Sequence, residues 1–342
     1  MGSAERGLGA SGAPIARIDA NGATLVLTRH GNYTVEPISF TSSRLQLAGT
    51  LYVPAGLERP APAIVILGPL GQVKEHSPVQ YATRLADEGF LVLAFDCAHH
   101  GESAGEPRQL IDPARKVADL RAAVGTVASL SMADPNAIVV VGIGEGGAEA
   151  IAAAASEPRI SAVVTVAGRY RDPDSDLVAL GGEDADLPTS EGARRLRARL
   201  ERARAASARY ATTGEVDYAP LVDPARDDVA LPGEAAWRWF NRNAGLGRWE
   251  NRYAVMGDLS YFAFESLGAA ASLTVPLLMV HGQMDSPDAA AARRHFERVA
   301  SPKQLVWLEE PSRLRYYDDP VVVDQVAAQI TRWLARGSPA RR

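Results

Sequence analysis

A glycine-rich turn near the middle of the chain places a carboxylate where a catalytic side chain is expected. Residues 142–147 read Gly-Ile-Gly-Glu-Gly-Gly, directly after the apolar run 138–141 and before a helical pattern. A strand, a sharp glycine turn and a helix form the frame in which the pattern Gly-x-Ser-x-Gly exposes a nucleophilic serine. The central position here is Gly144, which has no side chain, and the next residue is Glu145. The turn is therefore predicted to lack a nucleophile and to offer Glu145 as a general base.

Short apolar runs that alternate with helical patterns must position this turn. Several of the runs are continuously apolar, which is typical of parallel strands covered on both faces. Residues that can cap a helix stand before prolines at Ser77-Pro78, Asp112-Pro113, Ser286-Pro287 and Asp319-Pro320, and predict helix starts there. The alternation predicts an α/β fold with a doubly wound, mostly parallel sheet. We predict strands at 34–40, 45–53, 64–67, 91–95, 138–141, 162–166, 277–280 and 304–308.

The alternation stops between residues 169 and 273. This stretch contains a helical pattern rich in arginine and alanine at 191–210, several prolines and many aromatic residues, but no strand pattern. We interpret 169–273 as a helical cap inserted into a core formed by 14–168 and 274–336. The short ends of the chain, 1–13 and 337–342, are expected to be disordered tails.

The composition excludes several classes of function. The net charge of −5 at pH 7 disfavours nucleic-acid binding through phosphate neutralisation. No apolar run is long enough for a transmembrane helix, and the first residues lack the apolar core of a signal peptide, so we expect a cytoplasmic protein without a membrane partner. Cys97 is the only cysteine, and no Cys/His cluster has metal-ligand spacing, so neither a metal nor another cofactor is expected. The oligomeric state, a homodimer included, stays open.

Four further segments resemble the α/β-hydrolase fold, in particular its dienelactone-hydrolase and bacterial peptidase/esterase branch. They resemble, in chain order, its opening hairpin, its oxyanion loop, the turn after its fourth strand and the turn that carries its triad acid. These segments are residues 42–54, 68–75, 95–103 and 281–285. Together with the turn at 142–147, the resemblance extends over most of the chain and implies this fold with an inserted helical cap.

The sequence departs from this family at two of the three triad positions. Gly144 stands where the family has Ser or Cys, and Arg313 stands where it has His, just before the segment Tyr317-Asp-x-Pro. Only the acid, Asp285, is retained. Arginine is not deprotonated in proteins, so it cannot activate a nucleophile, and we do not expect an acyl-enzyme hydrolase. A shifted register that uses Ser312 or a distant histidine is the alternative.

The resemblance also implies that the anion-binding frame survives. The backbone N–H groups of Glu145 and Leu70 would point at a developing oxyanion, and the helix that starts near Gly146 would add its positive end. Such a frame without a nucleophile suits enolate chemistry, with Glu145 as the base. Arg313 is expected to bind an anionic substrate or, alternatively, to pair with Asp285.

Three other side chains are candidates for supporting roles. Glu149 lies one helical turn after Glu145 and is expected to pack below the site. Asp285, as a remnant of the triad, would orient the site. His99 lies in a turn where the family often has a structural histidine, and a structural role is expected for His281 as well.

The chain is similar to hydrolase-like enzymes of tetronate and spirotetronate polyketide pathways that eliminate acetic acid from an O-acetylated tetronate. This resemblance implies a lyase that acts on a small-molecule polyketide and leaves an exocyclic alkene. Two alternatives stay open: another enolate-type isomerase or cyclase, and a non-catalytic pseudohydrolase that binds a ligand. An open pocket that exposes the Glu145 carboxylate would favour an enzyme, and a filled pocket would favour a binding protein.

Overall fold

A computed structural model gives the arrangement of most of the chain. Within the residues that it describes, no helix is both long and apolar enough to span a membrane. Asp285 and the predicted tails 1–13 and 337–342 lie outside these residues. The described residues are 15–18, 24–30, 32–172, 175–177, 180, 190–283, 288–310 and 312–336.

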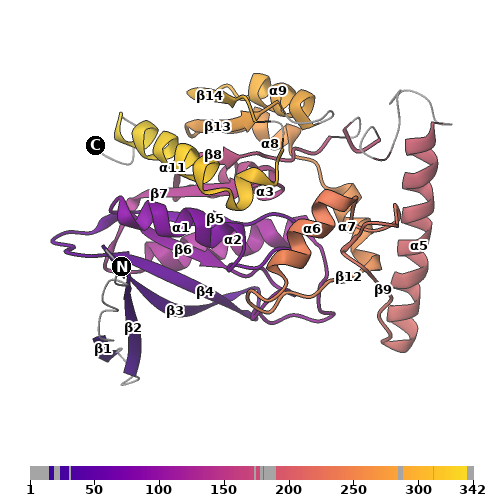
Figure 1. Cartoon of the computed structure of the whole chain (residues 1–342), viewed down its shortest axis with the longest axis horizontal. Coiled ribbons are helices and arrows are strands. Elements are labelled where there is room, and N and C mark those ends of the chain that lie inside the picture. The colour runs from indigo at the N-terminus through magenta and orange to yellow at the C-terminus, as the bar shows by residue number, and fades with distance from the viewer. Residues whose placement is uncertain are drawn as a thin grey trace, which may run out of the picture.

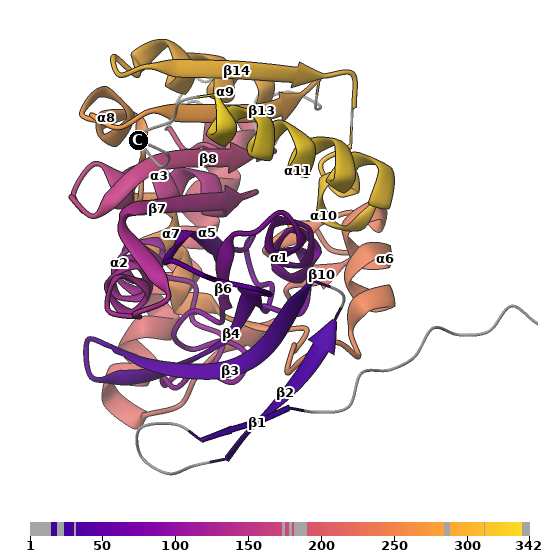
Figure 2. The same ribbon diagram turned by 90° about the vertical axis from the view of Figure 1, so that its left-hand side faces the viewer.

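A ten-stranded sheet runs through the molecule in the order β1-β2-β3-β4-β6-β5-β7-β8-β13-β14 (Figure 1 and Figure 2). In this order, neighbouring strands from β1 to β4 pair antiparallel, and so do β4 and β6. The remaining pairs, β6-β5, β5-β7, β7-β8, β8-β13 and β13-β14, are parallel. All eight predicted strands are confirmed, whereas no sequence pattern predicts the hairpin β1–β2. The strands are β1 (Ile15–Ile18), β2 (Thr24–His30), β3 (Tyr33–Ser42), β4 (Leu45–Pro54), β5 (Ala61–Leu67), β6 (Leu91–Phe95), β7 (Ala133–Ile143), β8 (Ile160–Val166), β13 (Leu277–Gly282) and β14 (Lys303–Leu308).

Helices cover both faces of the sheet, which confirms the doubly wound α/β fold (Figure 2). Alternate residues of a central strand point to opposite faces. Ile64 and Ile66 of β5 belong to the core beneath one group of helices, and Val65 and Leu67 belong to the core beneath the other. The first group is α1 (Ser77–Asp87), α10 (Arg315–Asp318) and α11 (Pro320–Ala335), and the second is α2 (Pro113–Ala128), α3 (Gly146–Ala154), α8 (Leu267–Ala271) and α9 (Asp288–Arg298).

Three of the four predicted helix starts are confirmed, and the fourth, at Ser286-Pro287, lies outside the described residues. One of the predicted caps is wrong. The side chain of Asp112 accepts a hydrogen bond from the Arg115 amide at the start of α2, and Asp319 caps α11 in the same way. Ser77, in contrast, lies inside α1 rather than before it. Its hydroxyl and its amide both donate to Oε1 of Gln72, so Ser77 anchors the loop that follows β5 instead of capping the helix.

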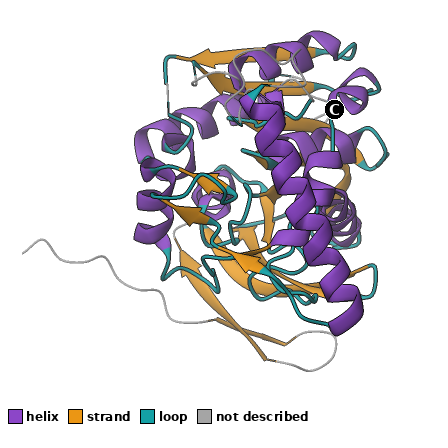
Figure 3. Cartoon of the chain, turned by 90° about the vertical axis from the view of Figure 1, so that its right-hand side faces the viewer, coloured by secondary structure: helices purple, strands orange, loops and turns teal. Residues whose placement is uncertain are grey.

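The segment between β8 and β13, here named the cap segment, contains most of the structure that stands outside the sheet layers (Figure 1 and Figure 3). Arg199 of α5 donates to both carboxylate oxygens of Asp258 at 3.0 and 2.7 Å, which fastens α5 to α7. The expectation that this segment has no strands is wrong, because two-residue strands are too short to show an alternating pattern. The elements are α5 (Glu191–Thr213), α6 (Glu234–Asn243), a 3₁₀ helix (Val255–Gly257) and α7 (Asp258–Ala263), with β9 (Tyr218–Ala219) paired to β12 (Tyr253–Ala254) and β10 (Val222–Asp223) paired to β11 (Leu231–Pro232).

Helix α8 follows α7 in the chain and falls within the predicted cap range 169–273, but it contacts α3 and α9 on the sheet. The outer limits of the cap therefore stay a prediction.

Candidate active site

The turn between β7 and α3 has the sharp geometry of a nucleophile elbow. Gly144 has a backbone φ of +58°, in the left-handed region that side chains rarely adopt. A Cβ on Gly146 would lie 2.4 Å from the carbonyl oxygen of Leu67, and a Cβ on Gly142 would lie 2.1 Å from the Gly146 carbonyl oxygen. Gly146 is therefore required by the close packing of the turn against the end of β5, and Gly142 by the sharpness of the turn itself.

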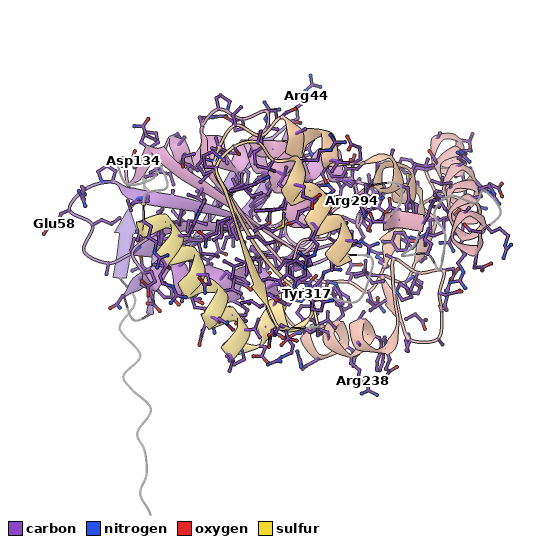
Figure 4. All side chains as sticks on the ribbon, turned by 90° about the horizontal axis from the view of Figure 1, so that it is seen from above. Arg44, Glu58, Asp134, Arg238, Arg294 and Tyr317 are labelled. Carbon is purple, nitrogen blue, oxygen red and sulfur yellow. The ribbon has the colours of Figure 1, made fainter. Side chains whose placement is uncertain are left out.

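The space next to Gly144 is occupied by a tyrosine hydroxyl. A Cβ on Gly144 would lie 2.7 Å from Oη of Tyr317 and 3.1 Å from Cβ of Pro69. Tyr317 belongs to α10 and is 5% exposed, inside the molecule (Figure 4). The sequence contains Tyr317 in the segment Tyr-Asp-x-Pro, but that segment only aligns Arg313 with the family's histidine and does not show that the hydroxyl reaches the elbow.

Glu145, the predicted base, is held by a residue of the cap segment. Oη of Tyr261 in α7 donates to Oε1 of Glu145 at 2.5 Å, and Nε of Arg169 lies 4.0 Å from the same oxygen. Burial raises the pKa of Tyr261 above its usual range, so its hydroxyl keeps the proton that it donates. No described residue donates to Oε2 of Glu145. The carboxylate thus has a fixed orientation and one oxygen without a donor.

The two amides of the predicted oxyanion site lie on adjoining loops. Pro69 packs beside Gly144, so the residues that follow them, Leu70 and Glu145, belong to loops that touch. No acceptor in the described part of the chain takes a hydrogen bond from the amide of Leu70 or Glu145. Helix α3 begins directly after Glu145, and its N-terminus adds a partial positive charge there. The arrangement suits an oxyanion.

Glu149 does pack below the site, as expected, but it is ion-paired with a lysine that the sequence pattern does not indicate. Oε1 and Oε2 of Glu149 lie 3.1 and 3.2 Å from Nζ of Lys116 in α2, and both side chains are buried. Burial, helped by the charge of Glu145, raises the pKa of Glu149 to about 7 against the attraction of Lys116. This buried ion pair joins α2 to the first turn of α3, the helix that follows the elbow.

His99 has a structural position rather than a place beside Glu145. Its backbone φ is +72°, and its Nδ1 lies 3.0 Å from the carbonyl oxygen of Pro107, which closes the loop that follows β6. The ring nitrogens of His281 lie 2.9 and 3.1 Å from the carbonyl oxygens of Gly282 and Gly168, so His281 joins β13 to the chain after β8.

The loop that follows β5 borders a cavity of ≈ 10 Å³, room for about one water molecule. Besides residues 68–73 of the loop, its lining includes Cys97, His100 and Lys116.

No group of three or more His, Cys, Asp or Glu side chains that could hold a metal occurs in the described residues.

Arg313, at the position of the family's histidine, contacts the loop that follows β8. Its Nε donates to the carbonyl oxygen of Ala167 at 3.2 Å, in the loop that follows β8. A pairing with Asp285 falls outside the described residues. Binding of an anionic substrate by Arg313 therefore stays a prediction, supported by the fork of donors that a guanidinium offers to oxyanions.

We expect Arg313→Ala to raise KM by about tenfold or more while kcat falls less, because a charge-assisted hydrogen bond to the substrate is lost. Steady-state kinetics of the elimination proposed below measures this. Arg315→Ala is the matched control, since the half-exposed side chain of Arg315 bonds, among the described residues, to Glu310 and Asp319. If Arg313→Ala lowers the melting temperature and leaves KM unchanged, Arg313 has a structural role only.

The order of the strands, the elbow after β7 and the cap segment define an α/β-hydrolase-fold protein. More narrowly, the chain belongs to the X-Pro dipeptidyl-peptidase (S15) family, whose sequence pattern matches residues 44–310. That range includes the loop after β5, the elbow and the cap segment. The resemblance to α/β-hydrolases is thereby confirmed.

Several known proteins are similar to parts of this chain. The uncharacterized protein PA2218 of Pseudomonas aeruginosa is 43% identical over 123 residues, which cover 35% of this chain and 33% of that protein. The uncharacterized protein YcjY of Escherichia coli is 37% identical over 134 residues, or 38% and 44% of the two chains. The polyketide transferase ATR5 of Stachybotrys chlorohalonatus is 32% identical over 146 residues, or 42% and 46%. The alignments thus span less than half of each of these curated relatives.

The similarity to PA2218 extends further in three dimensions. Its crystal structure superimposes with a TM-score of 0.74 at 26% sequence identity, and the match covers 89% of this chain and 94% of that one. The fold is therefore shared over nearly the whole of both chains.

Proposed function

We propose that this protein is a lyase that eliminates acetic acid from an O-acetylated tetronate and leaves an exocyclic alkene. The observation that carries the proposal is the exchange at the elbow, where Gly144 and the Tyr317 hydroxyl replace a nucleophile while Glu145 and the two free amides remain. The resemblance to tetronate-pathway enzymes supplies the substrate. The relative ATR5 is a polyketide transferase, which supports a polyketide as the substrate class.

The proposed reaction begins with the carboxylate of Glu145. Oε1 is held by Tyr261, and Oε2 takes the proton from the carbon next to the ring carbonyl. The electron pair of that C–H bond forms an enolate, whose oxygen accepts hydrogen bonds from the amides of Leu70 and Glu145. The enolate then re-forms its carbonyl, the carbon–oxygen bond to acetate breaks, and the exocyclic double bond forms. The proton stays on Glu145 until it passes to water or to the departing acetate.

A nucleophilic serine in this site would hydrolyse the acetate ester before it could be eliminated. The absence of a side chain at Gly144 removes that competing reaction, and Arg313 cannot serve as the base that a serine hydrolase needs.

We therefore expect no esterase activity toward p-nitrophenyl acetate and no covalent labelling by a fluorophosphonate, since both require an activated nucleophile. Intact-protein mass spectrometry after incubation with the probe measures labelling directly. Stoichiometric modification of any serine, Ser312 included, would contradict this prediction and restore the hydrolase interpretation.

Incubation of the protein with an O-acetylated tetronate tests the proposed function. We expect release of acetate together with a product that lacks one acetic acid, which mass spectrometry detects. A product of unchanged mass but altered structure would instead identify an isomerase or a cyclase. Release of acetate with retention of the hydroxyl would show hydrolysis and overturn the proposal.

One observation favours the second candidate, a non-catalytic binding protein. Glu145 is 5% exposed, and the Tyr317 hydroxyl fills the space beside Gly144. A substrate reaches the buried carboxylate of Glu145 only if side chains that cover it move. Binding of the acetylated tetronate without any turnover would establish this alternative.

A further inference from the structure

The hydroxyl of Tyr317 stands where the side chain of a nucleophile would begin. A Cβ at position 144 would lie 2.7 Å from Tyr317 Oη, a distance that real Cβ atoms do not show to a non-bonded neighbour. Any side chain at 144 therefore requires Tyr317 to shift. The glycine and the tyrosine are two halves of one replacement, in which a hydroxyl from α10 takes the place of a hydroxyl from the elbow.

The fold holds Tyr317 in this place from both sides. The carbonyl oxygen of Tyr316 accepts a hydrogen bond of 2.6 Å from Tyr81, which fixes α10 to α1. Asp318 accepts a hydrogen bond of 2.6 Å from Arg242 in α6. The ring of Tyr317 packs edge-on against Trp239, also in α6, with 5.5 Å between the ring centroids. Its hydroxyl is thus directed at the elbow by contacts with a core helix and a cap helix.

We propose that Tyr317 Oη is the third donor of the oxyanion site, beside the amides of Leu70 and Glu145. A tyrosine hydroxyl carries its proton at neutral pH, so it donates to an oxyanion rather than removing a proton. Hydrogen bonds from a hydroxyl to an ionised oxygen are short and strong. The assignment rests on the proposed function in that the oxyanion is the enolate oxygen of the substrate, and Tyr317 keeps its own proton throughout.

The assignment explains why loss of the nucleophile need not weaken anion binding. A serine hydrolase has two amide donors and a nucleophile that becomes part of the intermediate. Here the intermediate is an enolate that forms no bond to the protein, so the nucleophile's place is free for another donor. Tyr317 fills that place, and Gly144 leaves room for it.

Tyr317→Phe tests the assignment because it removes one hydroxyl and keeps the ring that packs on Trp239. Tyr316→Phe is the matched control, since the neighbouring Tyr316 is also buried and its hydroxyl has no hydrogen-bond partner in the structure. Two readouts are needed: the rate of acetate elimination, and the Kd of tetronic acid by calorimetry. The tetronic acid anion presents an enolate oxygen without undergoing turnover.

We expect Tyr317→Phe to weaken tetronic acid binding by about ten- to a hundredfold and to lower kcat by at least as much, because a hydrogen bond to a charged oxygen is lost. Tyr316→Phe is expected to match the wild type in both readouts. Circular dichroism and the melting temperature verify that both variants fold.

The outcomes separate this inference from the proposed function. If the wild type eliminates acetate and Tyr317→Phe retains the wild-type rate and Kd, the assignment of Tyr317 is overturned and the lyase function stands. If the wild type shows no elimination but binds tetronic acid through Tyr317, the lyase function is overturned and the oxyanion site stands. If the wild type neither eliminates acetate nor binds tetronic acid, both are overturned.

A second variant approaches the same site from the other side. Gly144→Ser places a Cβ against Tyr317 Oη and must displace it. We expect this variant to lose tetronic acid affinity by a similar factor and to gain no fluorophosphonate labelling. Retained affinity in a folded Gly144→Ser protein would also count against the role of Tyr317.

Discussion

Replacement of Glu145 by glutamine is expected to lower the rate of acetate elimination by about 10²–10⁴-fold, the usual contribution of a well-placed general base. Glutamine has nearly the same size as glutamate, and its carbonyl oxygen still accepts the hydrogen bond from Tyr261. The backbone amide at 145 also stays in place, so the oxyanion site is preserved. The variant therefore isolates the loss of the basic oxygen. Single-turnover kinetics with the acetylated tetronate measures the effect.

Three companion variants identify which carboxylate acts. Glu145→Asp is expected to keep partial activity, because its carboxylate is drawn back by one methylene and small misplacements reduce rates steeply. Tyr261→Phe is expected to lower kcat less than Glu145→Gln does, since it releases the orientation of the base but keeps the base itself. Near-wild-type turnover by folded Glu145→Gln would reject the assignment, and a large loss in Glu149→Gln alone would transfer the role to Glu149.

Features that depend on contiguous residues could be predicted from the sequence. The buried strands appear as short apolar runs, because parallel strands covered on both faces need apolar side chains at successive positions. The elbow is visible because the sharp turn demands glycine at 142 and its packing against β5 demands glycine at 146. Asp112 is recognisable as a helix cap because the cap and the amide that it binds are three residues apart.

Features that depend on contacts between distant segments could not be predicted. Tyr261 reaches Glu145 from 116 residues away in the chain, and Lys116 reaches Glu149 from another helix. Tyr317 approaches Gly144 only because α10 is held between α1 and α6. No spacing rule connects such pairs, since the sheet order and the cap bring them together. Ser77 shows the same limit at short range, because its hydroxyl binds Gln72 rather than the helix end.

The structure adds side chains to the predicted site and does not replace the residues that were predicted for it. Glu145 follows Gly144 in the elbow, Leu70 follows the Pro69 that packs on Gly144, and Glu149 is buried against Lys116. The side chains that orient and complete the site, Tyr261 and Tyr317, are aromatic residues that composition alone assigns to a core. A phenol has both an apolar ring and a polar tip, so its packing and its chemistry are indistinguishable until its hydroxyl is placed.

Lys116→Met is expected to cause the largest loss of stability among single substitutions at this site, about 3–5 kcal/mol near pH 8, because Glu149 loses its buried partner and must either stay an unpaired charge or take up a proton. Lys116 lies 3.1 Å from Glu149 Oε1, and Glu149 is 2% exposed. Urea unfolding followed by tryptophan fluorescence measures the free energy of unfolding. The double variant Lys116→Met/Glu149→Gln should recover most of the loss, since both charges are then absent.

The loss in Lys116→Met should also depend on pH in a defined direction. The pKa of Glu149 in the folded protein, about 7, lies above its value of 4.5 in an unfolded chain, so a bound proton favours the folded state. This contribution is complete below the unfolded value and is lost as the pH rises through the folded one. Removal of Lys116 raises the folded pKa of Glu149 further, so the variant keeps the proton beyond pH 7. Above pH 7 the carboxylate ionises in the wild type but not yet in the variant, and their free energies of unfolding diverge. The deficit relative to wild type should therefore be larger near pH 8 than near pH 6, by up to ~1.4 kcal/mol per pH unit of added shift. An equal deficit at both pH values would show that Lys116 acts through packing alone and not through the charge of Glu149.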